Sequence, residues 1–141
     1  GAGGVVFYVT DGGVHGREAA AEDQVSTQWG CYDTQISGAN GTVVGTGEQN
    51  TADIIADCNE TTAASVAAAY GPGWYLPSKD ELDLLYEQKD AGVVGGFANN
   101  YYWSSSQNSS RLAWAQTFVD GGYQYNGSKG SPIRVRAVRA F

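Results

Sequence analysis

The sequence has no methionine, one histidine, two cysteines and three prolines among its 141 residues. It also lacks a basic segment followed by an apolar stretch, so we expect a cut fragment or a processed chain whose targeting information has been removed. No apolar run approaches the ~20 residues of a membrane-spanning helix, so no membrane insertion is expected. With His15 alone and no GxSxG pattern, metal and Ser-triad catalysis are disfavoured.

Positive charge is scarce in the first half of the chain. Residues 1–70 contain nine acidic side chains and one basic one, Arg17, whereas residues 91–141 contain five basic side chains and one acidic one. The net charge of −7 disfavours nucleic acid as a partner, because phosphate binding needs a basic surface. The asymmetry still allows a polyanion to bind one local surface, since charges act within a Debye length of ~8–10 Å.

The length and the apolar content of 42 % are typical of a single domain over residues 1–141, with turns at many of the twenty glycines. Residues 5–9 predict a strand that ends in a turn at 11–13. Residues 14–50 are expected to be mostly loop with brief strands, and with a helical turn or two at 17–24. Two short helices are expected within 51–70, then an extended segment at 74–77 and a helix at 78–90 that Ser78 and Glu81 begin with a capping box.

Four antiparallel strands are expected after residue 100, at 101–106, 111–119, 123–126 and 133–141. Consecutive hairpins would join them into a meander. We therefore expect an α+β fold in which short helices pack on an antiparallel sheet with a C-terminal four-strand meander. The first and third connections of a meander lie at one end of the sheet, so the loops at 107–110 and 127–131 should be neighbours.

These two loops carry the strongest candidate ligand-binding residues. Arg111 and Lys129 supply positive charge, and small polar side chains surround them: Asn108, Ser110, Asn126 and Ser128. Such a set suits a sulfate or a carboxylate, which accepts charge-assisted hydrogen bonds. Tyr123 and Tyr125 could stack on sugar rings. The alternative is that both loops are ordinary polar hairpin tips.

Three further arginines lie in the last predicted strand, and period two places Arg134 and Arg136 on one face of it. They form either an exposed basic stripe or ion pairs with the acidic helix 78–90. We favour ion pairs, with Asp80, Glu81 or Asp83 as partners. For the tryptophans we favour the core over sugar platforms, at Trp74, Trp103 and Trp114.

The cysteines, Cys31 and Cys58, enclose 26 residues, which matches neither a zinc pair nor a redox CxxC motif. A disulfide is the favoured interpretation, and two buried free thiols are the alternative. No metal site and no cofactor are expected.

Several motifs together resemble one bacterial family. They are WYLPSKDEL at 74–82, YWSSS at 102–106 and RVRAVR at 134–139, with VVFYVTDGG at 5–13 and WGCY at 29–32. This set is similar to the C-terminal domain family of the Legionella collagen-like adhesin, which has a C-type-lectin-like fold, and the resemblance covers essentially the whole chain.

The resemblance implies a secreted, non-enzymatic domain on the bacterial cell surface, carried as a homotrimer on a collagen-like stalk. It also implies binding of sulfated glycosaminoglycans such as heparin, heparan sulfate or chondroitin sulfate, and of fucoidan-like polymers, in support of host attachment, virulence and biofilm formation. The chain lacks the Glu-Pro-Asn, Gln-Pro-Asp and Trp-Asn-Asp motifs of animal C-type lectins, so calcium-dependent monosaccharide binding is not expected.

Two other functions stay open on the residues alone. The first is a trimeric protein-interaction head that recognises a protein partner through aromatic and apolar contacts. The second is a hydrolase of cell-wall sugar, which would need two acids facing a cleft at roughly 5–10 Å.

Overall fold

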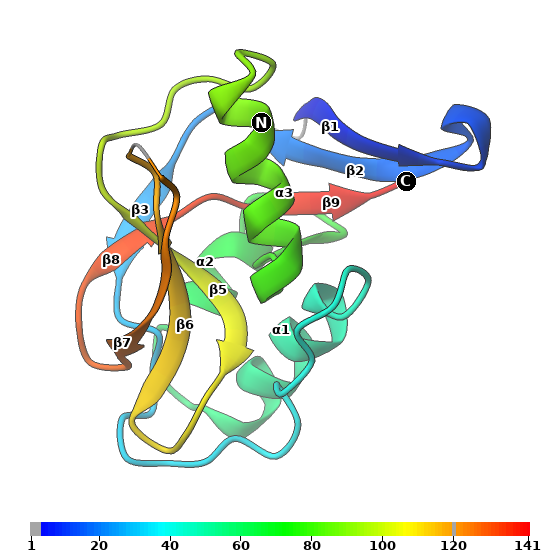
Figure 1. Ribbon diagram of the computed structural model, residues 1–141. Helices are drawn as coiled ribbons and strands as arrows, with labels where there is room; N and C mark the ends of the chain where they lie inside the picture. Colours follow the sequence, from blue (N-terminus) through cyan, green and yellow to red (C-terminus); the bar gives the residue numbers. More distant parts are fainter. Residues whose placement is uncertain (1–3, 120) are drawn as a thin grey trace.

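Two sheets flanked by helices make up the computed structural model, which describes residues 4–119 and 121–141 (Figure 1). The first sheet has the order β1-β2-β9-β4, with strands Gly4–Thr10, His15–Ala20, Val138–Ala140 and Trp74–Tyr75. The second has the order β3-β8-β5-β6-β7, with strands Gln24–Thr27, Ile133–Val135, Tyr101–Gln107, Leu112–Thr117 and Gln124–Ser128. Among the described strands, pairing is antiparallel except between β5 and β8.

The three predicted helices are confirmed, although the first begins four residues before the expected range of 51–70. α1 (Gly47–Asp57) and α2 (Ala63–Ala68) are the two short helices, and α3 (Lys79–Asp90) follows the extended strand β4. The expected capping box is confirmed, because the Ser78 hydroxyl accepts from the Glu81 N–H while the Glu81 carboxylate accepts from the Ser78 N–H. Within the described ranges, no helix combines the length and the apolar character needed to cross a membrane.

The helical turn expected at 17–24 is wrong. β2 pairs with β1 on one side and with β9 on the other, and β3 pairs with β8. Ala19 and Ala20 are fully buried in these layers. The helix propensity of alanine does not determine the structure of residues 15–20, because strand pairing on both sides and burial stabilise the extended chain.

The expected four-strand meander is correct only for its first three strands. β5, β6 and β7 form consecutive hairpins, but β8 pairs with β5 in parallel and β9 lies in the first sheet. The chain changes sheets near Arg136 and Ala137. The Arg136 guanidinium donates to the Ala20 carbonyl at 3.0 Å, and the Ala20 N–H donates to the Ala137 carbonyl at 2.9 Å. These long-range bonds fix a crossover that the local pattern of residues 133–141 does not reveal.

Buried side chains form two apolar clusters. One contains Trp29 and Trp103 and lies between α1, α2 and the second sheet, and the other contains Leu82 and lies beneath α3. Trp74 and Trp103 are buried, as the sequence predicts, whereas Trp114 is only partly buried.

Candidate functional site

The β5–β6 loop and the segment after β7 lie side by side, so their expected proximity is confirmed. The Lys129 N–H donates to the Arg111 carbonyl at 2.9 Å, and Asn108 Nδ2 donates to Asn126 Oδ1 at 2.6 Å. We call residues 107–111 and 126–131 the hairpin-tip surface; it lies at the lower end of the view in Figure 1. It contains all six predicted ligand-binding residues, and the roles of the five other than Lys129 toward a ligand stay predictions.

Lys129 does not contribute an exposed cation, and this part of the predicted site is wrong. Its side chain is fully buried, with Nζ donating to the Thr34 carbonyl at 2.9 Å and to Gln107 Oε1 at 3.0 Å, 4.5 Å from the centre of the Trp29 ring. Burial lowers the pKa of Lys129 to about 8, because desolvation disfavours the ammonium. Lys129 therefore ties residues 31–36 to the sheet and cannot meet a large polyanion.

Arg111 is the exposed cation of the hairpin-tip surface. Its Nε donates to Asp33 Oδ1 at 2.9 Å, the two side chains are 62 % and 58 % exposed, and the guanidinium lies 5.9 Å from the centre of the Tyr32 ring. The hydrogen bond to Asp33 raises the pKa of Arg111 above its usual value. Within the described ranges, the terminal nitrogens of Arg111 have no hydrogen-bond partner.

Two neutral polar residues of the tip, Asn126 and Ser128, lie on the side of β7 opposite the core. Asn126 and Ser128 of β7 face Trp114 and Leu112 of β6 across the ladder. The alternate position, Gly127, faces inward, since a Cβ there would lie 3.0 Å from the Trp103 ring. On the outer side Lys79 Nζ lies 4.4 Å from the centre of the Trp114 ring. Arg111 instead turns toward residues 32 and 33, so the predicted set divides over two sides of the tip.

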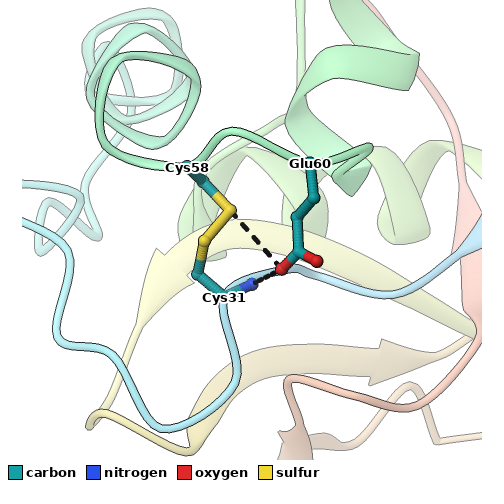
Figure 2. Close-up of side chains that lie close together, drawn as sticks. All are labelled: Cys31, Cys58 and Glu60. Atoms are coloured by element: carbon teal, nitrogen blue, oxygen red, sulfur yellow. Dashed lines mark hydrogen bonds between the residues drawn. A yellow bond between two sulfur atoms is a disulfide. The ribbon is translucent and has the colours of Figure 1, made fainter.

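The segment beside Arg111, residues 31–36, is anchored by side chains from three other parts of the chain. The favoured disulfide is confirmed, because Cys31 and Cys58 are bridged. Glu60 accepts a hydrogen bond from the Cys31 N–H at 2.6 Å, which holds the same end of the segment (Figure 2). At the other end, Gln107 Oε1 accepts from the Ile36 N–H at 3.1 Å. We call residues 31–36 the strapped loop.

The strapped loop offers no free thiolate to a metal ion. Cys31, Cys58 and Glu60 offer potential ligand atoms within 4.8 Å of one another, and in residues 4–119 and 121–141 they are the only such group of three. Both sulfurs are consumed by the disulfide, whereas zinc takes cysteine as thiolate. The histidine, His15, lies elsewhere, exposed at the start of β2, with Nδ1 3.0 Å from Asp11 Oδ2.

The arginines near the C-terminus form ion pairs, but not with the acids of α3. Arg136 and Arg134 bind Asp23 at 2.8 and 3.4 Å, and Arg139 binds Glu18 at 3.0 Å. The expected partners Asp80, Glu81 and Asp83 are wrong because strand pairing supplies other acids. β8 pairs with β3, which brings Arg134 and Arg136 to Asp23, and β9 pairs with β2, where Arg139 lies opposite Glu18.

Two sets of contacts in this region were not predicted from the sequence. Asp33 and Tyr32 lie against Arg111 although they are far away along the chain, and no local pattern marks them. Lys79 reads as the first residue of a helix, but its side chain covers Trp114. As for the tyrosines, Tyr125 packs 4.8 Å from Tyr101, and Tyr123 is 72 % exposed.

Comparison with known proteins identifies the family of this chain. A search of the curated proteins gives no significant match. A solved structure with a similar fold is the crystal structure of a fimbrial protein from Bacteroides ovatus ATCC 8483, with a TM-score of 0.64 and 17 % sequence identity over 91 % of this chain. This chain corresponds to only 36 % of that one. Residues 18–139 match the model of the Lcl C-terminal domain, and the chain therefore belongs to the Lcl C-terminal domain family.

Proposed function

We propose that this chain is a non-enzymatic, surface-exposed adhesin domain that binds sulfated polysaccharide at the hairpin-tip surface. Membership of the Lcl C-terminal domain family supports the adhesin type and an extracellular location. In this proposal Arg111 supplies the charge, and the neighbouring amides and hydroxyls of Asn108, Ser110, Asn126 and Ser128 orient the sugar. Lys129 has no contact with the ligand.

The observation that carries the proposal is the state of Arg111. It is the exposed cation of the tip, since Lys129 is buried, and its terminal nitrogens have no partner within the described part of the chain. A guanidinium presents paired N–H groups that match the oxygens of a sulfate. A long polyanion such as heparin or chondroitin sulfate offers such groups repeatedly.

One Arg111 per domain binds weakly, so the proposal includes a homotrimer. Three copies of one weak site on a linked assembly raise the effective concentration of cations along a single polymer. This arrangement fits a domain whose net charge is −7, because the bulk of its surface repels a polyanion and only a local site attracts it.

A matched pair of charge variants tests the proposal. Arg111→Gln and Lys89→Gln each remove one positive charge, but Lys89 lies at the far end of α3 from the tip residues. Arg111→Gln should weaken binding to immobilised heparin about two- to fivefold per site, and Lys89→Gln should leave it unchanged. Equal heparin affinity of Arg111→Gln and the wild type contradicts the assignment.

A protein partner is the second candidate, and the surface beside Arg111 favours it. Tyr32 and Leu112 are 51 % and 37 % exposed next to this arginine, and tyrosine and arginine are frequent anchors of protein interfaces. Salt separates the two functions. Heparin binding should weaken steeply as NaCl rises through the physiological range, whereas an apolar interface should change little.

We also propose that the fold is C-type-lectin-like. Pairing of β2 with β9 brings the two ends of the chain into one sheet, and a long irregular segment between β3 and α1 is cross-linked by the disulfide. These features and the resemblance of the sequence motifs support the assignment.

A further inference from the structure

We propose that Asp33 is a built-in competitor at the ligand site, whose carboxylate masks Arg111 and is displaced or opposed by every anion that binds there. The inference rests on the proposed function, since it concerns the same cation. It assigns to Asp33 the control of affinity and of the preference for strongly charged polymers.

The contact between the two side chains has the geometry of a reversible mask. Asp33 occupies only the Nε side of the guanidinium, at 2.9 Å, and both partners are more than half exposed. An exposed ion pair is weak because water competes with it. A sulfate can therefore take the free terminal nitrogens or replace the carboxylate, and in both cases the negative charge of Asp33 opposes it.

The strapped loop holds Asp33 in this position from both sides. The disulfide and the Glu60 hydrogen bond fix residue 31, and Lys129 fixes residue 34 through its carbonyl. The backbone of Asp33 is itself left-handed, with φ of 71°, a conformation that Asp and Asn tolerate better than most residues. Asp33 can thus leave Arg111 by rotating its side chain, while the loop stays in place.

The backbone of Arg111 is fixed as well, so binding does not require ordering of its loop. Its carbonyl accepts from the Lys129 N–H at 2.9 Å, and its N–H donates to Ser109 Oγ at 3.3 Å. The masked pair carries no net charge. A polymer must therefore supply a concentrated local charge to compete, which favours sulfated over merely carboxylated chains.

Four variants test the competitor role against immobilised heparin and against hyaluronan, which has carboxylates and no sulfate. They are Asp33→Asn, Arg111→Gln, the double variant and Glu87→Gln, which removes an exposed carboxylate on α3. Asp33→Asn should raise heparin affinity about two- to fivefold and raise the hyaluronan signal by a larger factor. Glu87→Gln should have no such effect, and in the Arg111→Gln background the gain from Asp33→Asn should disappear.

The outcomes separate this inference from the proposed function. If Arg111→Gln weakens heparin binding but Asp33→Asn leaves it unchanged or lowers it, the competitor role is wrong and the proposed site stands. A gain from Asp33→Asn that persists without Arg111 also overturns the inference, since bulk charge then explains it. If heparin affinity does not depend on Arg111 at all, the proposed function itself fails. Melting temperatures within a few degrees of the wild type show that each variant is folded.

Discussion

At the scale of single residues, the cations of this protein have unequal surroundings despite similar sequence contexts. Every arginine in the chain forms an ion pair with a carboxylate, whereas the lysines form none within the described ranges. Arg136 is the most enclosed, with its guanidinium bound to Asp23 and to the carbonyls of Ala20, Gly95 and Gly96, 3.9 Å from the Phe97 ring. Such residues stabilise the fold and are unavailable to ligands.

Arg136→Ala should lower the free energy of unfolding by roughly 3–5 kcal/mol, because it removes the buried cation that faces Asp23 and leaves three carbonyls without their donor. Heparin affinity should not change. Urea denaturation measures the first effect, and Arg139→Ala is the control. The pair of Arg139 with Glu18 is a third exposed on the arginine side, so that variant should lose about 1 kcal/mol or less. Equal losses in the two variants would show that enclosure of Arg136 adds no stability.

At the scale of elements, local sequence patterns predicted where a helix begins and ends, but not which strands pair. The capping box of Ser78 and Glu81 and the break at Gly92 locate α3 within a residue or two, because these interactions lie within the helix itself. Strand partners are set by residues far away along the chain, so the pairing of β8 with β5 and of β9 with β2 was not predictable from residues 133–141.

In the candidate site, too, local sequence predicted some features, whereas distant contacts decide others. The hairpin rule correctly predicted that the two loops are neighbours, because hairpin geometry is local. It could not distinguish Arg111 from Lys129, since both are basic residues in short polar loops. The difference arises from Thr34 and Gln107, which accept hydrogen bonds from Lys129 across the strapped loop. The burial of Lys129 thus depends on its contact with Thr34, which lies far away along the chain.

The strapped loop should respond to loss of its disulfide at one end only. The double variant Cys31→Ala/Cys58→Ala should lower the free energy of unfolding by about 3 kcal/mol, because the cross-link restricts the unfolded chain. Amide hydrogen exchange should accelerate at the Cys31 position more than at Ile36, whose N–H keeps its bond to Gln107. Uniform acceleration across residues 31–36 would show that the disulfide holds the whole segment.

At the scale of the whole molecule, buried lysine and tyrosine side chains have opposite effects on stability as the pH rises. The pKa of Lys129 is lowered by burial to about 8 from a usual 10.5, so between these values the unfolded chain binds more protons and stability increases with pH. Burial raises the pKa of Tyr125 to about 12 and also raises that of Tyr75 and Tyr102. Above pH 10 the unfolded tyrosines ionise first, and stability then falls.

The urea midpoint should therefore increase from pH 8 to about pH 9.5 in the wild type and increase less, or not at all, in Lys129→Met. Lys89→Met is the matched control and should keep the wild-type slope. Both cysteines are bridged and the chain has no others, so thiol exchange does not disturb the measurement at alkaline pH. An identical slope in Lys129→Met and the wild type would contradict the assignment of this titration to Lys129.

The position of the hairpin-tip surface relative to the ends of the chain has a mechanical consequence. The first and last strands, β1 and β9, lie in the upper part of the view in Figure 1, and the loops of the tip lie in its lower part. If the tip binds a polymer as we propose, a pull between that polymer and an end of the chain would run from the second sheet to the first. At the junction between the two sheets, the Arg136 guanidinium donates to the Ala20 carbonyl, so this contact would have to withstand the pull.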